Sequence, residues 1–404
     1  MDFASFNLDP RILKGVQALG YTVPTPIQVQ AIPPILQGKD VMGLAQTGTG
    51  KTAAFALPIL QRLAQGRRGR IRALVIAPTR ELAEQTHESF GTLGRQTSAR
   101  SVTLYGGVNI SPQIRKLREG VEIAVACPGR LLDHLQQGTV DLSQVEVLVI
   151  DEADRMFDMG FLPDVRRILK RLPPKRQTLL FSATMPNDIR SLAHDILHDP
   201  VTVQVDHMVP LATVAHALYP VESHQKSELL LQILYGTDTE AVLVFTRTKH
   251  RAKRLASLLQ DAGFRATSLQ GNLSQSRRQT ALDGFRSGKI QILVATDIAS
   301  RGIDVSGISH VINYDMPDTP DAYTHRIGRT GRAAKTGDAF TLMTREDSGM
   351  VRAIERNLGA PIERRRIDGF EVKPPAPKKA EAARPARRPH QHQYPGRRRP
   401  AWSH

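Results

Sequence analysis

The chain has 404 residues, of which 40% are hydrophobic and 23% are charged, which is enough apolar sequence for the cores of two domains. Its net charge of +16 predicts a polyanionic partner, either nucleic acid or an acidic membrane surface. No run approaches the roughly 18 apolar residues that span a bilayer, and the N-terminal residues show no secretion signal. The single cysteine, Cys127, excludes an internal disulfide and a multi-cysteine zinc site. We expect a cytoplasmic protein, and of the two polyanions we expect nucleic acid, not a membrane, to be the partner.

The first half of the chain alternates apolar, strand-like runs with amphipathic stretches. Continuous apolar strands separated by helices are typical of a parallel sheet covered on both faces, so we expect an α/β fold with a doubly wound parallel sheet. The predicted strands are 40–44, 72–78, 121–127, 145–150 and 178–181, and the predicted helices are 53–65, 81–93 and 163–171.

The same alternation returns in the second half, with an interruption at Pro210. We predict a first domain over 1–207, a linker over 208–213 and a second domain over 214–368. The second domain contains no lysine-bearing phosphate loop. Its predicted strands are 241–246, 265–269, 290–296, 310–314 and 339–343, and its predicted helices are 249–262, 277–287 and 322–326.

Residues 369–404 form a basic tail rich in proline. Between Glu371 and His404, nine Lys or Arg stand against two Glu, a net charge of +7. So few apolar residues cannot offset the entropy of ordering, and we expect a disordered segment. It could tether structured RNA through charge and stacking by Tyr394 or Trp402, or serve only as a solubilising extension.

A phosphate-binding loop follows the first predicted strand. Its glycines let backbone N–H groups point at phosphate oxygens, and the following helix adds its positive end. Lys51 can reach the β- and γ-phosphates of ATP, and the Thr52 hydroxyl can ligate Mg²⁺. The loop consists of Ala45, Gln46, Thr47, Gly48, Thr49, Gly50, Lys51 and Thr52.

Two carboxylates, Asp151 and Glu152, end a later strand of the same domain. The carboxyl ends of parallel strands share one edge of the sheet, which places both residues beside the phosphate loop. Asp151 would hold Mg²⁺ through water, and Glu152 would orient and deprotonate the attacking water. The sequence thus predicts half of a site for nucleotide hydrolysis.

With these motifs in place, the chain resembles the DEAD-box RNA helicases over about residues 3–345. The resemblance implies two tandem RecA-like domains. Residues 20–28 (GYTVPTPIQ) resemble the family's adenine-reading segment, in which Gln28 and Thr25 would contact the nucleotide. Phe3 occupies the place of the ring that stacks on the base; Tyr21 or Phe6 could be that ring instead, although core packing suits Phe6 better.

The resemblance also implies an RNA-binding groove across both domains, and two departures from the family pattern, Cys127 and Gln270, lie in or near it. The implied RNA contacts are Arg80, Gly106, Gly107, Gly129, Arg130, Arg278, Thr296 and Gly302. The implied coupling residues, which link hydrolysis to strand separation, are Ser182, Thr184, Asp154 and His325. Asp304 would meet the ATP ribose, and Arg329 and Arg332 would be arginine fingers that reach the γ-phosphate from the second domain.

The implied function is local, ATP-dependent separation of short RNA duplexes with Mg²⁺ as cofactor and little sequence preference. The VFTRTK and GRTGRAA runs and the basic tail are most like bacterial RhlE-type helicases, which associates the chain with ribosome assembly or RNA turnover. Ribosomal precursors or RNA-decay proteins are then expected partners, and we expect a monomer. Two alternatives stay open: an ATP-dependent RNA clamp or annealing chaperone that serves as an assembly platform, and a DNA-remodelling ATPase of the same superfamily.

Overall fold

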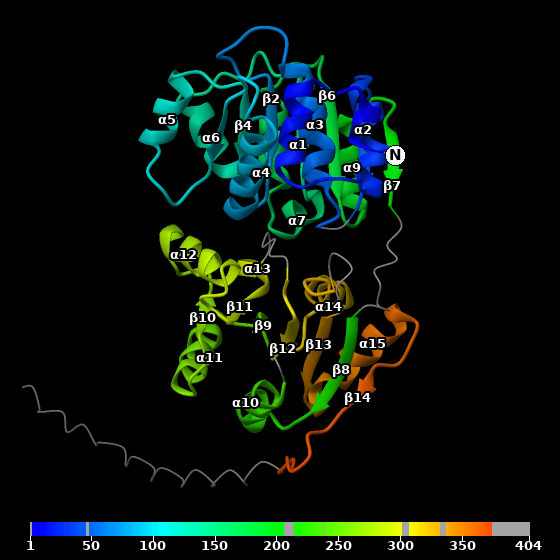
Figure 1. Ribbon diagram of the computed structural model, residues 1–404, viewed down its shortest axis with the longest axis vertical. Helices are drawn as coiled ribbons and strands as arrows, with labels where there is room; N and C mark the ends of the chain where they lie inside the picture. The colour runs from blue at the N-terminus through cyan, green and yellow to red at the C-terminus, as the bar shows by residue number, and fades with distance from the viewer. Residues whose placement is uncertain are drawn as a thin grey trace, which may run out of the picture.

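The computed structural model describes residues 2–45, 48–205, 214–237, 239–300, 307–331 and 337–373. The predicted linker and nearly all of the predicted tail lie outside these ranges. Within them the chain forms two α/β domains, one above the other in Figure 1. No helix in these ranges combines the length and apolar character that crossing a membrane requires.

The first domain is built on a seven-stranded parallel sheet with the strand order β3-β4-β2-β5-β6-β1-β7. Its strands are β1 (Val41–Leu44), β2 (Ala73–Ile76), β3 (Ser101–Leu104), β4 (Ile123–Ala126), β5 (Val147–Ile150), β6 (Gln177–Ser182) and β7 (Val201–Gln204). Its helices are η1 (Phe3–Phe6), α1 (Pro10–Ala18), α2 (Pro26–Leu36), α3 (Lys51–Leu63), α4 (Arg80–Leu93), α5 (Ser111–Arg118), α6 (Pro128–Gln136), α7 (Ala153–Asp158), α8 (Leu162–Leu169) and α9 (Asn187–Ile196).

The second domain repeats this design in the order β10-β11-β9-β12-β13-β8-β14, again parallel throughout. Its strands are β8 (Val214–Pro220), β9 (Val242–Phe245), β10 (Ala266–Leu269), β11 (Ile292–Ala295), β12 (His310–Asn313), β13 (Gly337–Met343) and β14 (Glu363–Arg364). Its helices are η2 (Ser223–Gln225), α10 (Lys226–Gly236), α11 (Lys249–Asp261), α12 (Gln275–Arg286), α13 (Asp297–Ser300), α14 (Pro320–Ile327), η3 (Arg345–Asp347) and α15 (Ser348–Leu358).

Each sheet separates two hydrophobic cores, because successive side chains of a strand point to opposite faces. In β5, Val147 and Val149 join one core of the first domain, whereas Leu148 and Ile150 join the other. β9 divides its side chains between the two cores of the second domain in the same way. The prediction of an α/β fold with parallel sheets buried on both faces is confirmed.

Candidate nucleotide and nucleic-acid site

The phosphate loop connects β1 to α3 at the carboxyl edge of the first sheet. Gly48 and Gly50 have φ angles of 83° and 94°, a left-handed conformation that favours glycine. A Cβ on Gly50 would lie 2.5 Å from Nε2 of Gln28, so a side chain has no room there. Lys51 is the first residue of α3 and is buried. Gln46 and Thr47 lie outside the described residues.

Gln28 is bonded within the protein at both ends of its amide. Its Oε1 accepts a hydrogen bond from the Thr25 backbone N–H at 2.9 Å, and its Nε2 donates to the Gly50 carbonyl at 3.1 Å. The amide therefore ties the start of α2 to the phosphate loop. An adenine base would have to replace these bonds, so adenine reading by Gln28 stays a prediction.

Three aromatic rings cluster beside this segment. Phe3 is only 5% exposed and stacks on Tyr21 with ring centroids 6.3 Å apart, whereas Phe6 meets Phe3 edge-on at 6.0 Å. Tyr21 is 42% exposed. Of the three rings, Tyr21 has the most accessible surface for a base, and Phe6 belongs to the core.

Asp151 follows β5 and is 2% exposed. Burial raises the pKa of its carboxyl, while the nearby charge of Lys51 lowers it. Its Oδ1 has no hydrogen-bond partner among the described residues. A buried carboxylate oxygen without a partner is costly, and a divalent cation held by Asp151 and the Thr52 hydroxyl of α3 fits this place.

Glu152 has φ 52° and ψ 55°, which is a strained backbone conformation for a residue with a side chain. Its carboxylate is buried and pairs with Nη1 of Arg155 at 2.5 Å, one turn later in α7. Sequence reasoning missed Arg155, although an arginine three residues after a glutamate on a helix is a recognisable pair. The arrangement fixes the second carboxylate beside the first.

Asp154 joins the carboxylate motif to the end of β6. Its Oδ2 accepts hydrogen bonds from the backbone N–H of Ala183 at 3.1 Å, and from the backbone N–H and the hydroxyl of Thr184 at 2.9 and 3.1 Å. The Asp154 N–H in turn donates to Oγ of Ser182 at 3.2 Å. Three of the predicted coupling residues thus form one network.

The fourth predicted coupling residue, His325, belongs to α14 of the second domain and lies near enough to Asp154 for their charges to interact. Its side chain is exposed to solvent, although charged groups of both domains, among them Asp154 and Arg329, lie near it. Desolvation lowers its pKa, and the charge of Asp154 opposes this effect across the cleft. Figure 1 shows α7 and α14 at the facing edges of the two domains.

Arg329 follows α14 and is buried close to His325. Arg326, in the preceding turn, makes two 2.6 Å bonds to Asp297 and lies 5.0 Å from the ring centre of Phe245. Arg326 therefore anchors this segment, a role that the sequence did not reveal. The second predicted finger, Arg332, lies outside the described residues, as do Gly302 and Asp304.

Several predicted RNA contacts of the first domain lie together. The Arg80 guanidinium packs on Gly107, where a Cβ would come within 2.3 Å of it. Arg130 donates to the Val108 carbonyl at 3.0 Å. Space beside Gly106 and Gly129 is open, since no atom lies within 4 Å of a Cβ built on either glycine. Cys127 caps α6 between these segments, and burial raises its pKa to about 12.

The resemblance implies that the segment ending at Arg278 holds RNA and bridges the domains, and the structure shows Arg278 in a contact between the domains. Its Nε donates to Oε1 of Glu81 at 2.7 Å, and both side chains are buried. Beside this pair, Arg80 of the first domain donates to Gln275 of the second at 3.3 Å. A carboxylate repels phosphate, so Glu81 within a predicted RNA-binding segment was a signal for a protein contact. In the second domain, Thr296 is half-buried after β11.

Comparisons with known proteins agree with this geometry. The DEAD/DEAH box helicase family matches residues 25–192, and the helicase conserved C-terminal domain matches residues 225–334. The ATP-dependent RNA helicase CshA of Listeria monocytogenes is 45% identical over 87% of this chain and 68% of its own length. The DEAD-box ATP-dependent RNA helicase CshA of Bacillus subtilis is 43% identical over 90% of this chain and 73% of its own length. Since both carry the CshA name, the RhlE-type assignment stays a prediction.

Solved structures show the same two domains. S. cerevisiae Dbp5 bound to RNA and ADP BeF3 is 30% identical and has a TM-score of 0.80, with 91% of this chain and 95% of that chain covered. A DEAD box protein from Methanococcus jannaschii is 38% identical, with 91% of this chain and 99% of that chain covered, but has a TM-score of 0.53. Over the whole chain, this structure is therefore more similar to Dbp5 than to the M. jannaschii protein. Two tandem RecA-like domains are confirmed, and the chain belongs to the DEAD-box helicase family.

Proposed function

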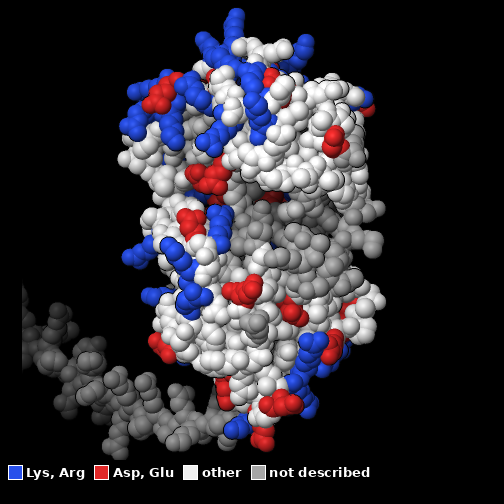
Figure 2. Space-filling model, in the orientation of Figure 1, with Lys and Arg blue, Asp and Glu red and all other residues white. Residues whose placement is uncertain are grey.

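We propose that the chain is an ATP-dependent RNA helicase that separates short duplexes locally. Its CshA relatives are named as RNA helicases, and a Dbp5 structure to which the chain is similar at a TM-score of 0.80 is bound to RNA. Basic side chains gather over the end of the first domain that carries α5, whose last turn contains Arg115, Lys116 and Arg118 (Figure 2). The charge distribution suits a polyanionic substrate.

The hydrolysis site would draw on both domains. Lys51 binds the β- and γ-phosphates, and Glu152 orients the attacking water and takes its proton. Arg329, with Arg332, stabilises the charge that develops on the γ-phosphate from the opposite side of the cleft. Asp151 and Thr52 would hold Mg²⁺, which would neutralise phosphate charge.

Coupling to RNA would run through the Asp154 network. The Asp154 contacts to Ala183 and Thr184 make the segment after β6 respond to any shift of the carboxylate motif. His325 adds the second domain to the same network, and closure aligns the RNA-binding segments of both domains. ATP and RNA then each favour the closed arrangement and strengthen one another's binding.

The observation that carries the proposal is the buried Oδ1 of Asp151 near the Lys51 charge, for which the described residues supply no hydrogen-bond partner. His325 of the second domain lies close enough to Asp154 for their charges to interact. We expect contacts to phosphates and 2′-hydroxyls to dominate, which favours RNA without sequence preference. ATP hydrolysis measured without nucleic acid, with single-stranded RNA and with single-stranded DNA tests this. Equal stimulation by DNA and RNA would favour the DNA-remodelling alternative. A role in ribosome assembly or RNA turnover is part of the proposal.

A further inference from the structure

The second domain has a lysine and an acidic residue at the positions equivalent to the phosphate site of the first domain. The two sheets have the same strand order, so β8 corresponds to β1 and β12 to β5. In the first domain α3 follows β1 and begins at Lys51, and in the second domain α10 follows β8 and begins at Lys226. Glu152 stands two residues after β5, and Asp315 stands two residues after β12.

A cavity of about 340 Å³ lies at this edge of the second sheet. It is within the range of about 300–1,000 Å³ that is usual for small-molecule sites. Three cations, Lys226, Arg251 and Arg254, and one carboxylate, Asp315, line it, which leaves a net charge of +2 with neutral histidine. α10 lies at the end of the second domain away from the first, so the cavity is separate from the cleft between the domains (Figure 1).

The Lys226 ammonium is a buried charge with spare hydrogen-bonding capacity. Its residue is 6% exposed, and its Nζ donates to the Tyr314 carbonyl at 2.9 Å. An ammonium has three N–H donors, so this bond leaves two for a ligand. Burial lowers the pKa of Lys226, while the charge of Asp315 raises it.

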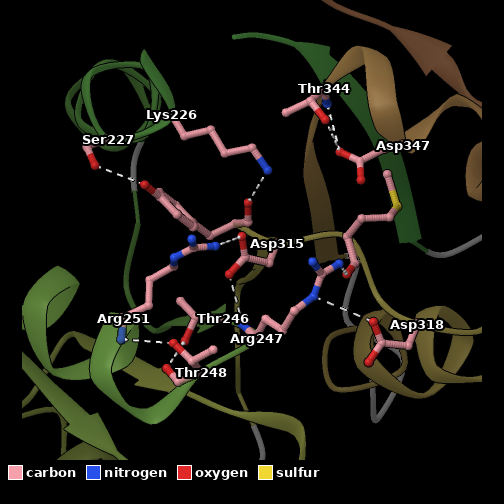
Figure 3. Close-up of polar contacts among 12 residues, drawn as sticks. Lys226, Ser227, Thr246, Arg247, Thr248, Arg251, Asp315, Asp318, Thr344 and Asp347 are labelled. Atoms are coloured by element: carbon pink, nitrogen blue, oxygen red, sulfur yellow. Dashed lines mark hydrogen bonds and ion pairs between the residues drawn. The ribbon is translucent and has the colours of Figure 1, made fainter. Parts of the chain in front are cut away.

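Asp315 is committed to other partners. Its Oδ1 accepts from Nη1 of Arg251 at 2.5 Å, and its Oδ2 accepts from the Arg247 backbone N–H at 2.8 Å. Figure 3 shows Lys226 and Arg251 converging on this point from α10 and α11. The carboxylate thus offsets one cation, and the charges of Lys226 and Arg254 remain available to an anion.

The rest of the lining suits an organic group attached to that anion. Leu255 and Leu258 of α11 supply apolar surface, and Ser227 supplies a hydroxyl that bonds the Tyr314 hydroxyl at 2.9 Å. Residues 221–226 contain no glycine, so the backbone cannot wrap a triphosphate as the first-domain loop does. Asp315 is the one carboxylate in the described lining, and because both its oxygens are bonded, none is free to activate water.

We propose that this cavity binds, without hydrolysing it, the phosphate of a phosphorylated nucleoside, supplied either by a free nucleotide or by the 5′ end of an RNA strand. Lys226 and Arg254 hold the phosphate as charge-assisted donors, and the leucines cover the ring system. The site is distinct from the hydrolysis site and does not depend on it.

Calorimetric titration of the full-length chain with inorganic pyrophosphate tests the proposal in a Lys51→Ala background, which disables the first-domain loop. We expect binding to survive Lys51→Ala and to weaken at least about tenfold when Arg254→Glu is added. Lys253→Glu is the matched control, because Lys253 is exposed on the same helix but does not line the cavity. Lys226→Met, checked for an unchanged unfolding midpoint, should weaken binding to a similar extent.

Two further titrations identify the source of the phosphate. GDP binding that depends on Arg254 in the Lys51→Ala background indicates a free nucleotide. A preference for 5′-phosphate over 5′-hydroxyl RNA of the same sequence, lost in Arg254→Glu, indicates an RNA end. If Arg254→Glu and Lys253→Glu behave alike with every probe, or if Lys51→Ala alone abolishes pyrophosphate binding, the second site does not exist. The proposed helicase activity is unaffected by that outcome.

Discussion

The carboxyl edges of the two sheets place a lysine and an acidic residue in matching positions, yet the residues around them differ. In the first domain, Gly48 and Gly50 give the loop a left-handed backbone, and Oδ1 of Asp151 has no hydrogen-bond partner among the described residues. In the second domain, a glycine-free turn precedes Lys226, and both oxygens of Asp315 are bonded. The fold therefore supplies the matching positions, whereas only the first domain has the glycines and the available carboxylate oxygen that the proposed hydrolysis requires.

A large effect is expected where Arg329 of the second domain enters the proposed hydrolysis site. We expect Arg329→Ala to slow RNA-stimulated ATP hydrolysis about a thousandfold or more, because the arginine stabilises transition-state charge. Lys289→Ala, at an exposed position of the same domain, should leave the rate unchanged. If Arg254→Glu, in the second-domain cavity, slows ATP hydrolysis as much as Arg329→Ala does, the distinction between the two domains is wrong.

Within the first domain, Glu152→Gln should slow ATP hydrolysis about a hundredfold to ten-thousandfold while ATP and RNA still bind, because only the general base is lost. Lys51→Ala should abolish turnover through loss of phosphate binding. Single-turnover hydrolysis and equilibrium binding of ATP separate the two cases. A Glu152→Gln chain with near-normal turnover would remove this glutamate from the proposed mechanism.

A smaller and more selective effect is expected at the coupling network. Thr184→Val removes the 3.1 Å hydroxyl bond to Asp154 at constant shape. A hydrogen bond to a charged group contributes about 1.5–3 kcal/mol, so we expect about a tenfold to hundredfold loss of duplex separation with ATP hydrolysis retained. Thr202→Val, at an exposed position of β7, is the control. Equal losses in both activities would show that Thr184 does not couple them.

The smallest effect should come from the interdomain pair of Glu81 and Arg278. If the pair stabilises closure, Glu81→Gln and Arg278→Gln should be non-additive in ATP-dependent RNA affinity, with a coupling of about 1 kcal/mol. Glu88→Gln, at an exposed position of α4, serves as the control. If Arg278→Gln weakens RNA binding equally with and without Glu81, Arg278 contacts RNA directly, as the sequence predicts.

Strands with continuous apolar runs could be predicted from the sequence, since IAVA in β4 and VLVI in β5 are buried on both faces. β3 and β7 could not, because they lie at the sheet edges and expose alternate residues. β8 was not predicted either, because His216 and Pro220 interrupt its apolar pattern. Unless β8 is recognised as the counterpart of β1, the equivalent positions of Lys226 and Lys51 cannot be seen in the sequence. Because β8 was not predicted, the second-domain cavity could not be predicted from the sequence.

For the site, motif spacing was sufficient to bring together the phosphate loop, both carboxylates and the segment after β6. It was not sufficient for contacts that depend on how the domains meet. Glu81 and Arg278 are 197 residues apart in the sequence, and no local sequence pattern predicts the hydrogen bond between them. The side-chain rotamer of Gln28 also determines its hydrogen-bond partner, and in this structure its amide donates to the Gly50 carbonyl. Phe3 is buried whereas Tyr21 is exposed, and the sequence alone could not predict which of the two rings is more accessible.

The most direct test of the central claim compares ATP hydrolysis by residues 1–207 with hydrolysis by the full chain, both with single-stranded RNA. Both cores of the first domain are built from residues within 3–205, so the fragment retains its own packing. We predict that the fragment is at least about a hundredfold slower, because Arg329 and the second half of the RNA groove are missing. A fragment as fast as the RNA-bound full chain would contradict a hydrolysis site completed by two domains.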